Sequence, residues 1–357
     1  MKIVSIAASR EDFGLTRPYT IAFDTTESVE NVIVRIETDA GQSALGAASP
    51  APHVTGETLE ACEAALRPDA LQWLVGRDVR ETAALGRELD RRMGPAPAAR
   101  AAVDMALHDL LARRLEVPLV ELLGRAHDAL PTSITIGIKD AVETLAEAEE
   151  YVGRGFAILK VKTGLSLEED IERLRKLRAK YPASGAVRIR ADANQGYSAS
   201  ETERFFRETS GLELEFLEQP VPADGVAEMR RLPEEMRARI AADESLLSDR
   251  DALALAQPPR AAGIFNIKLM KCGGIAPARR IATIAELAGI ELMWGCMDES
   301  VVSIAAALHA ALASPATRYL DLDGSLDLAR DVARGGFRLE NGWMSALDSP
   351  GLGVTPI

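Results

Sequence analysis

The chain has 357 residues, of which 47% are apolar and 4% aromatic, and its formal net charge is −13. This apolar fraction excludes wholesale disorder and supports one large domain, or a barrel with a smaller companion. The acidic balance argues against a nucleic-acid partner, because the phosphate backbone would be repelled. It suits a cationic substrate or a metal ion.

The three cysteines, Cys62, Cys272 and Cys296, are far apart and form no CxxC pair. This usage is typical of a reducing compartment, and it predicts no structural zinc site. The opening residues, MKIVSIAASRED, alternate like a strand, so we expect no secretory signal. No stretch is apolar enough to span a bilayer. We therefore expect a cytoplasmic protein without a membrane partner, and the sequence leaves homo-oligomerisation open.

The first 125 residues predict strands followed by helices. Residues 2–9 and 30–41 read as strands, and the second runs into a turn at Gly41. Residues 98–115 carry apolar side chains at helical spacing. We expect an α+β capping domain over residues 1–125, with loops that set substrate specificity.

Short β-rich runs then alternate with helix-like segments, eight times over. The runs cover residues 133–138, 157–162, 187–194, 212–220, 239–245, 263–270, 290–296 and 318–324. Such alternation predicts parallel βαβ units, and eight of them favour a closed barrel over an open sheet. We predict an α/β fold, a (β/α)7β TIM-like barrel over residues 126–324, with a C-terminal segment, 325–357, that returns to complete the cap.

Carboxylates end three adjacent predicted strands. Asp192, Glu218 and Asp243 follow one another at intervals of 26 and 25 residues. In such barrels the strand ends carry the catalytic groups, and three converging carboxylates repel one another unless a cation neutralises them. An all-oxygen set favours Mg²⁺. Each residue alone is more often a helix N-cap or part of a turn, so the prediction depends on the combination.

Lysines lie on the strands that flank these carboxylates. Lys160 and Lys162 point to one side of the second strand, because side chains alternate with period two, and Lys268 ends the sixth. Strands two and six lie across the barrel mouth, so Lys162 and Lys268 approach opposite faces of one substrate carbon. One base on each face of a carbon acidified by a metal-bound carboxylate allows racemisation or epimerisation. We expect a lowered pKa for lysines near other cations.

In combination, these motifs resemble the enolase superfamily, in its muconate-lactonising subgroup, over essentially the whole chain. They are KVK at 160–162, DANQGY at 192–197, EQP at 218–220, ADES around Asp243 and NIKLMKCGG at 266–274. The resemblance implies Mg²⁺ on Asp192, Glu218 and Asp243. It also implies Lys162 and Lys268 as the acid/base pair, with Lys160 stabilising the enolate oxygens.

Within that subgroup, DLD at 321–323 resembles the dipeptide epimerases, the group that contains L-Ala-D/L-Glu epimerase. The resemblance implies that Asp321 and Asp323 bind the free α-ammonium of a dipeptide, while the metal takes its terminal carboxylate. The alternative is that DLDG closes a strand with a turn.

One departure from the Ala-Glu enzymes concerns specificity. They place an arginine in a cap loop, where it meets the substrate's Glu side chain, and the matching position here is Asp24. An aspartate repels glutamate and attracts lysine or arginine, and Asp298 after the seventh strand adds negative charge. We therefore predict a dipeptide epimerase that prefers cationic dipeptides. The alternative is that Asp24 is a solvated loop residue.

Other classes of protein fit these residues less well. N-acyl amino acid racemase and o-succinylbenzoate synthase share the scaffold, but their substrates, like that of muconate cycloisomerase, lack the ammonium that DLD would bind. A glycosidase leaves Lys162 and Lys268 unexplained. A His-ligated metallohydrolase is disfavoured because the four histidines lie away from the predicted strand ends. A catalytically silent binding barrel would have lost a base lysine or a metal carboxylate, and all are present.

Overall fold

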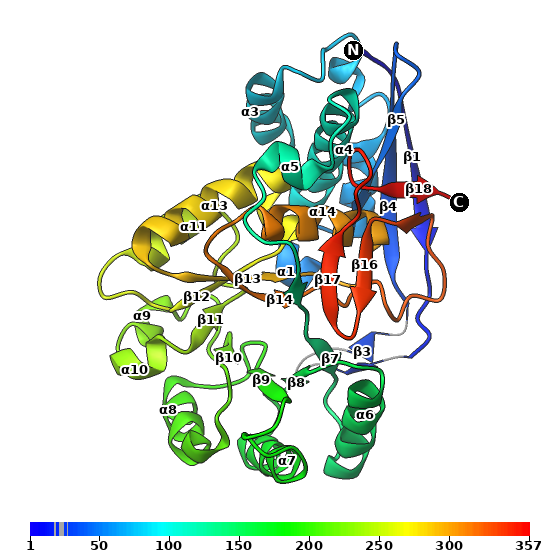
Figure 1. Cartoon of the computed structure of the whole chain (residues 1–357). Coiled ribbons are helices and arrows are strands. Elements are labelled where there is room, and N and C mark those ends of the chain that lie inside the picture. Colours follow the sequence, from blue (N-terminus) through cyan, green and yellow to red (C-terminus); the bar gives the residue numbers. More distant parts are fainter. Residues whose placement is uncertain (18, 21–24, 27) are drawn as a thin grey trace.

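The computed structural model describes every residue except 18, 21–24 and 27. A capping layer lies at one end, and an eight-stranded parallel sheet curls into a near-closed barrel at the other (Figure 1). This arrangement confirms the predicted fold class. The division at residues 125 and 324 stays our proposal.

The cap is built on an antiparallel sheet in the order β1 (Ile3–Asp12), β4 (Glu30–Thr38), β5 (Ser43–Ala48). Its helices are α1 (Pro52–Thr55), α2 (Leu59–Leu66), α3 (Thr82–Met93), α4 (Pro97–Arg114) and α5 (Leu119–Leu123). Helix α4 starts with a proline, whose missing N–H is no loss in the first turn. It packs on β5 so closely that a Cβ added at Gly46 would lie 1.8 Å from the Ala102 carbonyl oxygen.

The barrel strands follow one another in chain order around the sheet. They are β7 (Ile134–Ile136), β8 (Ile158–Lys162), β9 (Arg188–Asp192), β10 (Leu217–Glu218), β11 (Ile240–Ala242), β12 (Ile264–Ile267), β13 (Glu291–Gly295) and β14 (Thr317–Asp321). The Ser133 N–H donates to the Leu320 carbonyl at 3.0 Å, which brings the last strand beside the first. The second and sixth strands, β8 and β12, therefore lie opposite each other, as predicted.

Helices connect the strands and cover the barrel's outside. They are α6 (Ala141–Gly153), α7 (Leu167–Lys180), α8 (Ala199–Glu208), α9 (Val226–Met229), α10 (Glu234–Arg237), α11 (Asp249–Ala256), α12 (Leu269–Cys272), α13 (Ile275–Ala288) and α14 (Val301–Leu312). Helix α7 illustrates why they form: the Ser166 side chain caps its first turn, and Ile171, Leu174 and Leu177 are buried on one face.

The C-terminal segment runs back to the cap (Figure 1). It forms β15 (Ala333–Gly335), β16 (Phe337–Glu340), β17 (Trp343–Ala346) and β18 (Val354–Pro356), and β17 pairs with β6 (Leu130–Pro131). The Leu352 N–H donates to Asp109 Oδ1 on α4 at 2.7 Å, and the Leu119 N–H donates to the Gly351 carbonyl at 2.8 Å. These contacts confirm that the tail completes the cap.

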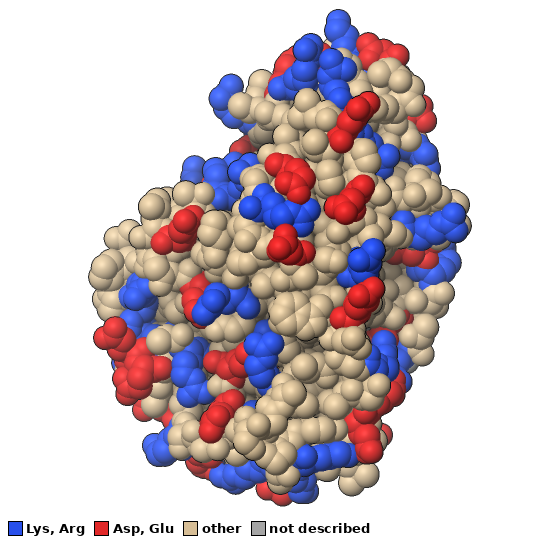
Figure 2. All heavy atoms as spheres, in the orientation of Figure 1, with Lys and Arg blue, Asp and Glu red and all other residues tan. Residues whose placement is uncertain are grey.

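Charged side chains of both signs are interspersed over the face shown in Figure 2. The negative charge of the chain is therefore not gathered into one patch on that face. None of the helices formed by the described residues has the length and apolarity that a bilayer span requires.

Candidate active site

Strand register brings the predicted site residues to one level at the barrel mouth. Lys162 of β8 is the register partner of Asp192 on β9, and Asp192 is the partner of Glu218 on β10. Asp243 comes directly after β11, and Lys268 directly after β12. Because parallel barrel strands end at the same rim, residues far apart in the sequence meet in one place.

Lys160 links carboxylates from three strands. Its ammonium nitrogen lies 2.7 Å from Asp321 Oδ2, 2.8 Å from Glu218 Oε2 and 3.1 Å from Asp192 Oδ2. The side chain is almost fully buried, at 2% exposed. A buried cation of this kind persists because it is surrounded by matching charge.

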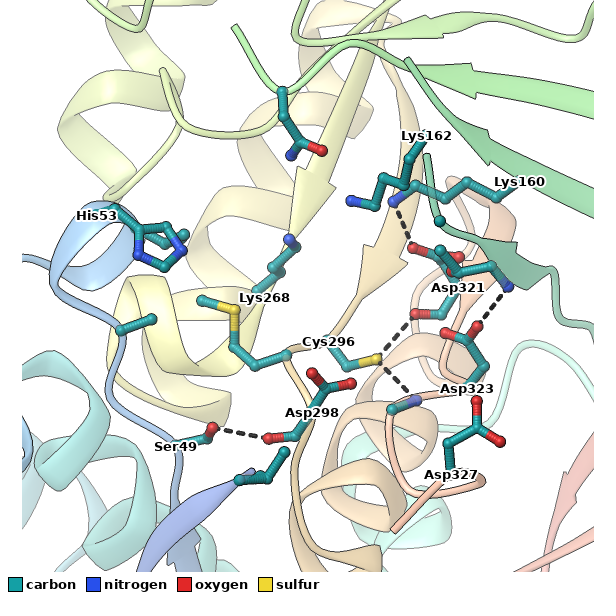
Figure 3. Close-up of a pocket in the computed structure, with 18 of the residues that line it drawn as sticks. Ser49, His53, Lys160, Lys162, Lys268, Cys296, Asp298, Asp321, Asp323 and Asp327 are labelled. Atoms are coloured by element: carbon teal, nitrogen blue, oxygen red, sulfur yellow. Dashed lines mark hydrogen bonds and ion pairs between the residues drawn. The ribbon is translucent and has the colours of Figure 1, made fainter. Parts of the chain in front are cut away.

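Lys162 and Lys268 face each other from opposite walls of the cavity (Figure 3). Lys162 Nζ lies 2.7 Å from Asp192 Oδ2, and Lys268 Nζ lies 2.8 Å from Asp243 Oδ2. The structure thus brings together the two predicted bases and the carboxylates predicted to hold the metal.

Lys271 also belongs to this cluster, and we did not predict it. Its ammonium donates to Asp243 Oδ1 and, at 3.0 Å, to the Asn266 carbonyl, while the Asn266 amide donates to Glu218 Oε1 at 2.7 Å. Lys271 stands one helical turn after Lys268, and that spacing was the available signal.

The pKa values show that the cluster is crowded with negative charge. Burial raises the pKa of Glu218 to about 8, and the nearby Asp192 carboxylate contributes to this rise. Burial likewise raises the pKa of Glu244 to about 7, with a contribution from Asp243. Burial opposes ionisation of Asp192 too, but Lys162 and Lys160 outweigh it and lower its pKa to about 2. Burial disfavours the charged form of Lys268, yet Asp243 outweighs this and its pKa is raised. These carboxylates favour the ammonium form of Lys268, whereas the neighbouring Lys160 opposes it, so the lowered lysine pKa expected near cations stays a prediction.

The oxygen atoms of this cluster fit a hard divalent cation. Buried Glu244 Oε2 and Asn194 Oδ1 lack a hydrogen-bond donor in the described part of the chain. Among those residues, no three His, Cys, Asp or Glu side chains already surround one point, because the lysine ammonium groups lie between the carboxylates. An all-oxygen set with excess negative charge is the environment that Mg²⁺ prefers.

Asp321 and Asp323 lie on the same side of the cavity as Lys160, across from His53 (Figure 3). Asp321 Oδ1 accepts a hydrogen bond from Ser133 Oγ at 2.6 Å, and its other oxygen is held by Lys160. Asp323 Oδ2 accepts from the Thr135 N–H at 2.7 Å, and burial, followed by Asp321, raises the pKa of its carboxyl to about 7. Of the two, Asp323 is the one more available to an added cation.

The cavity has a volume of about 550 Å³, a size typical of small-molecule sites. Its lining includes all three predicted lysines as well as Asp298, Asp321 and Asp323. Ser49 of the cap donates to the Asp298 carbonyl at 2.8 Å, which fixes Asp298 where the cap meets the barrel. Asp24 lies outside the described residues.

Two protein-family models match successive parts of the chain. The model described as "Mandelate racemase / muconate lactonizing enzyme, N-terminal domain" matches residues 5–124, and "Enolase C-terminal domain-like" matches residues 143–357. The chain belongs to the enolase superfamily. The predicted resemblance is thereby confirmed, and it extends over both parts of the fold.

Within the superfamily, the chain is 62% identical to L-Lys-D/L-Arg epimerase of Methylococcus capsulatus, over 99% of each chain. It is 36% identical to L-Ala-D/L-Glu epimerase of Bacillus subtilis, over 99% of this chain and 97% of that one. The crystal structure of the Methylococcus capsulatus dipeptide epimerase with Mg and the dipeptide L-Arg-D-Lys matches with a TM-score of 0.97, covering 99% of this chain and 100% of that one.

Proposed function

We propose that the protein is a Mg²⁺-dependent dipeptide epimerase, an isomerase that inverts the α-carbon of the C-terminal residue of cationic dipeptides. The observation that carries the proposal is the pair Lys162 and Lys268, which face each other across a cavity that the Asp321–Asp323 pair also lines. Full-length similarity to L-Lys-D/L-Arg epimerase supports it.

Asp192, Glu218 and Asp243 would hold Mg²⁺. When bound there, Mg²⁺ stabilises negative charge on the substrate carboxylate and so makes the neighbouring α-hydrogen more acidic. Lys160 is placed among the same carboxylates and adds positive charge close to those oxygens.

Inversion needs a base on each face of the α-carbon. One of Lys162 and Lys268 removes the α-proton, and the ammonium form of the other returns a proton from the opposite face. The two side chains come from β8 and the end of β12, on opposite sides of the barrel, so neither needs to cross the substrate. The product is the epimer, with no net change in atoms.

The Asp321–Asp323 pair orients the substrate. In the proposed orientation, the dipeptide carboxylate binds Mg²⁺ and the free ammonium lies beside Asp323, which lines the same cavity. N-acyl substrates lack this charge, so the half-buried Asp323 carboxylate would have no cation to bind. We propose Asp24 and Asp298 as the groups that favour cationic side chains.

We also propose a cytoplasmic location. All three cysteines are free thiols, and Cys62 and Cys272 are buried. Free thiols suit a reducing compartment.

Deuterium uptake tests the activity. Purified protein with Mg²⁺ in D2O is offered L-Lys-L-Arg, L-Arg-L-Lys, L-Ala-L-Glu, L-Leu-L-Tyr and N-succinyl-L-Arg, and masses are followed with time. We expect a gain of one mass unit in the Lys/Arg dipeptides, dependent on Mg²⁺ and abolished by a chelator.

Uptake led by L-Ala-L-Glu would retain the chemistry and overturn the specificity. Uptake confined to N-succinyl-L-Arg would overturn the role of the Asp321–Asp323 pair, and no uptake at all would overturn the proposed function.

A further inference from the structure

Four further segments of the chain contribute to the cavity. Thr135 at the end of β7, Glu147 and Tyr151 of α6, Asp327 of the loop after β14, and Arg17 of the cap all line it. None of these side chains has a role in the proton transfers. Thr135 donates its N–H to Asp323, and Asp327 lies beside Asp323 in Figure 3, so this part of the lining is next to the proposed ammonium site.

Asp327 is held firmly by its backbone. The Leu326 N–H donates to the Asp323 carbonyl at 2.8 Å and forms a turn between the two aspartates. The Asp327 carbonyl then accepts from the Thr16 N–H at 2.8 Å and from Thr16 Oγ1 at 3.0 Å, which fastens the loop to the cap. As a result, the Asp327 side chain lies next to Asp323 along the cavity wall (Figure 3).

The Asp327 carboxylate has no hydrogen-bond or ion-pair partner among the described residues. Burial raises its pKa. A partly buried carboxylate without a partner is costly, and a cation supplied by a ligand would relieve that cost.

The neighbouring cations are already matched to other carboxylates. Arg17 contacts both oxygens of Glu150, at 3.1 and 2.9 Å, and Glu147 at 3.3 Å. Arg154 lies 3.6 Å from Glu150, and Lys139 pairs with Glu147. Arg17, Arg154 and Lys139 therefore all pair with Glu147 or Glu150. Arg17 and Arg154 also favour the ionised form of Asp327, from a longer distance.

The substrate's own chemistry determines which of its groups reaches this part of the cavity. In a dipeptide, the ammonium and the side chain of the N-terminal residue leave from the same carbon. If the ammonium lies at Asp323, that side chain enters the space bordered by Asp327. The C-terminal side chain leaves the carbon that lies between Lys162 and Lys268, and we place it at Asp298, a separate residue of the cavity lining.

We infer that Asp327 is a specificity-determining residue that binds the cationic side chain of the N-terminal residue, a lysine or arginine. The charged end of that side chain would form a charge-assisted hydrogen bond with the Asp327 carboxylate, which lines the cavity. This inference rests on the proposed function and deepens it by separating the two side-chain sites.

The test compares two dipeptides that differ only in the charge of the N-terminal side chain. Deuterium incorporation gives kcat/KM for L-Lys-L-Arg and for L-norleucyl-L-Arg, which has the same carbon stem without the charge. We expect Asp327→Asn to reduce the preference for the lysyl substrate by roughly tenfold or more, since a charge-assisted contact is lost. The ratio of L-Lys-L-Arg to L-Lys-L-norleucine reports the C-terminal site and should not change.

The matched control is Asp128→Asn, which removes the same charge from an exposed position outside the cavity. It should leave both ratios as in the wild type. Turnover of the norleucyl substrate by Asp327→Asn reports that the variant is folded, and Asp327→Glu should restore part of the lysyl preference.

An Asp327→Asn variant that keeps the wild-type preference for L-Lys-L-Arg would overturn the inference while leaving the epimerase intact. Equal loss in both ratios would overturn the separation of the two sites. A wild type that exchanges no dipeptide would overturn the proposed function, and this inference with it.

Discussion

Asp323 is the residue whose charge state should govern substrate capture near neutral pH. Burial, followed by Asp321, raises the pKa of its carboxyl to about 7. Below that pH the carboxyl is protonated and neutral, so it attracts the substrate ammonium less. Above it the carboxylate is present.

We therefore expect kcat/KM for a free dipeptide to fall as the pH falls through about 7, mainly through a rising KM. Asp323→Asn should remove this acidic limb and lower kcat/KM at high pH by roughly tenfold to a hundredfold. A pH–rate profile of both proteins checks this. An unchanged acidic limb in Asp323→Asn would assign the titration to another group.

For single residues, the sequence predicted which side chains share a side of a strand better than it predicted which side chains they bind. Lys160 and Lys162 share a side because strand side chains alternate, and this holds in any sheet. That Lys160 binds Asp321 as well as Glu218 depends on closing the barrel, which no local pattern contains. Asp327 was missed because its role appears only when the cap, α6 and the loop after β14 come together.

Among the elements, β5 shows the limit of local propensity. Its sequence, SALGAA, lacks the β-branched and aromatic residues that favour strands, and we did not predict it. Its small side chains instead allow α4 to approach closely, with Gly46 against the Ala102 carbonyl. By contrast, α4 itself was expected at 98–115 and is found at Pro97–Arg114, because its pattern is long and regular.

Gly46→Ala tests this packing. The added methyl has no room beside Ala102, so we expect a loss of about 1–3 kcal/mol in the free energy of unfolding and a lower Tm. Gly86→Ala is the matched control: it lies within α3, where an added Cβ meets nothing within 4 Å, and should stabilise by about 0.5–1 kcal/mol. Equal effects from both changes would contradict the account of the cap.

At the scale of the whole molecule, the eightfold repeat was sufficient to predict the barrel and the order of its strands. Strand lengths were less predictable. Residues 212–220 were expected as one strand, but β10 contains Leu217–Glu218, since Glu213 adopts a left-handed conformation with φ 48° and turns the chain before the strand. The predicted lysines and carboxylates still meet at the barrel mouth, because their positions depend on where strands end and not on where they begin.

The central claim is that Lys162 and Lys268 act on opposite faces of one α-carbon. The most direct measurement is α-proton exchange in D2O by the Lys162→Ala and Lys268→Ala variants, each given L-Lys-L-Arg and L-Lys-D-Arg separately. We predict that neither variant interconverts the epimers, and that each exchanges the α-proton of one epimer, a different one in each case. Exchange of the same epimer by both variants, or continued epimerisation by either, would contradict the two-base arrangement.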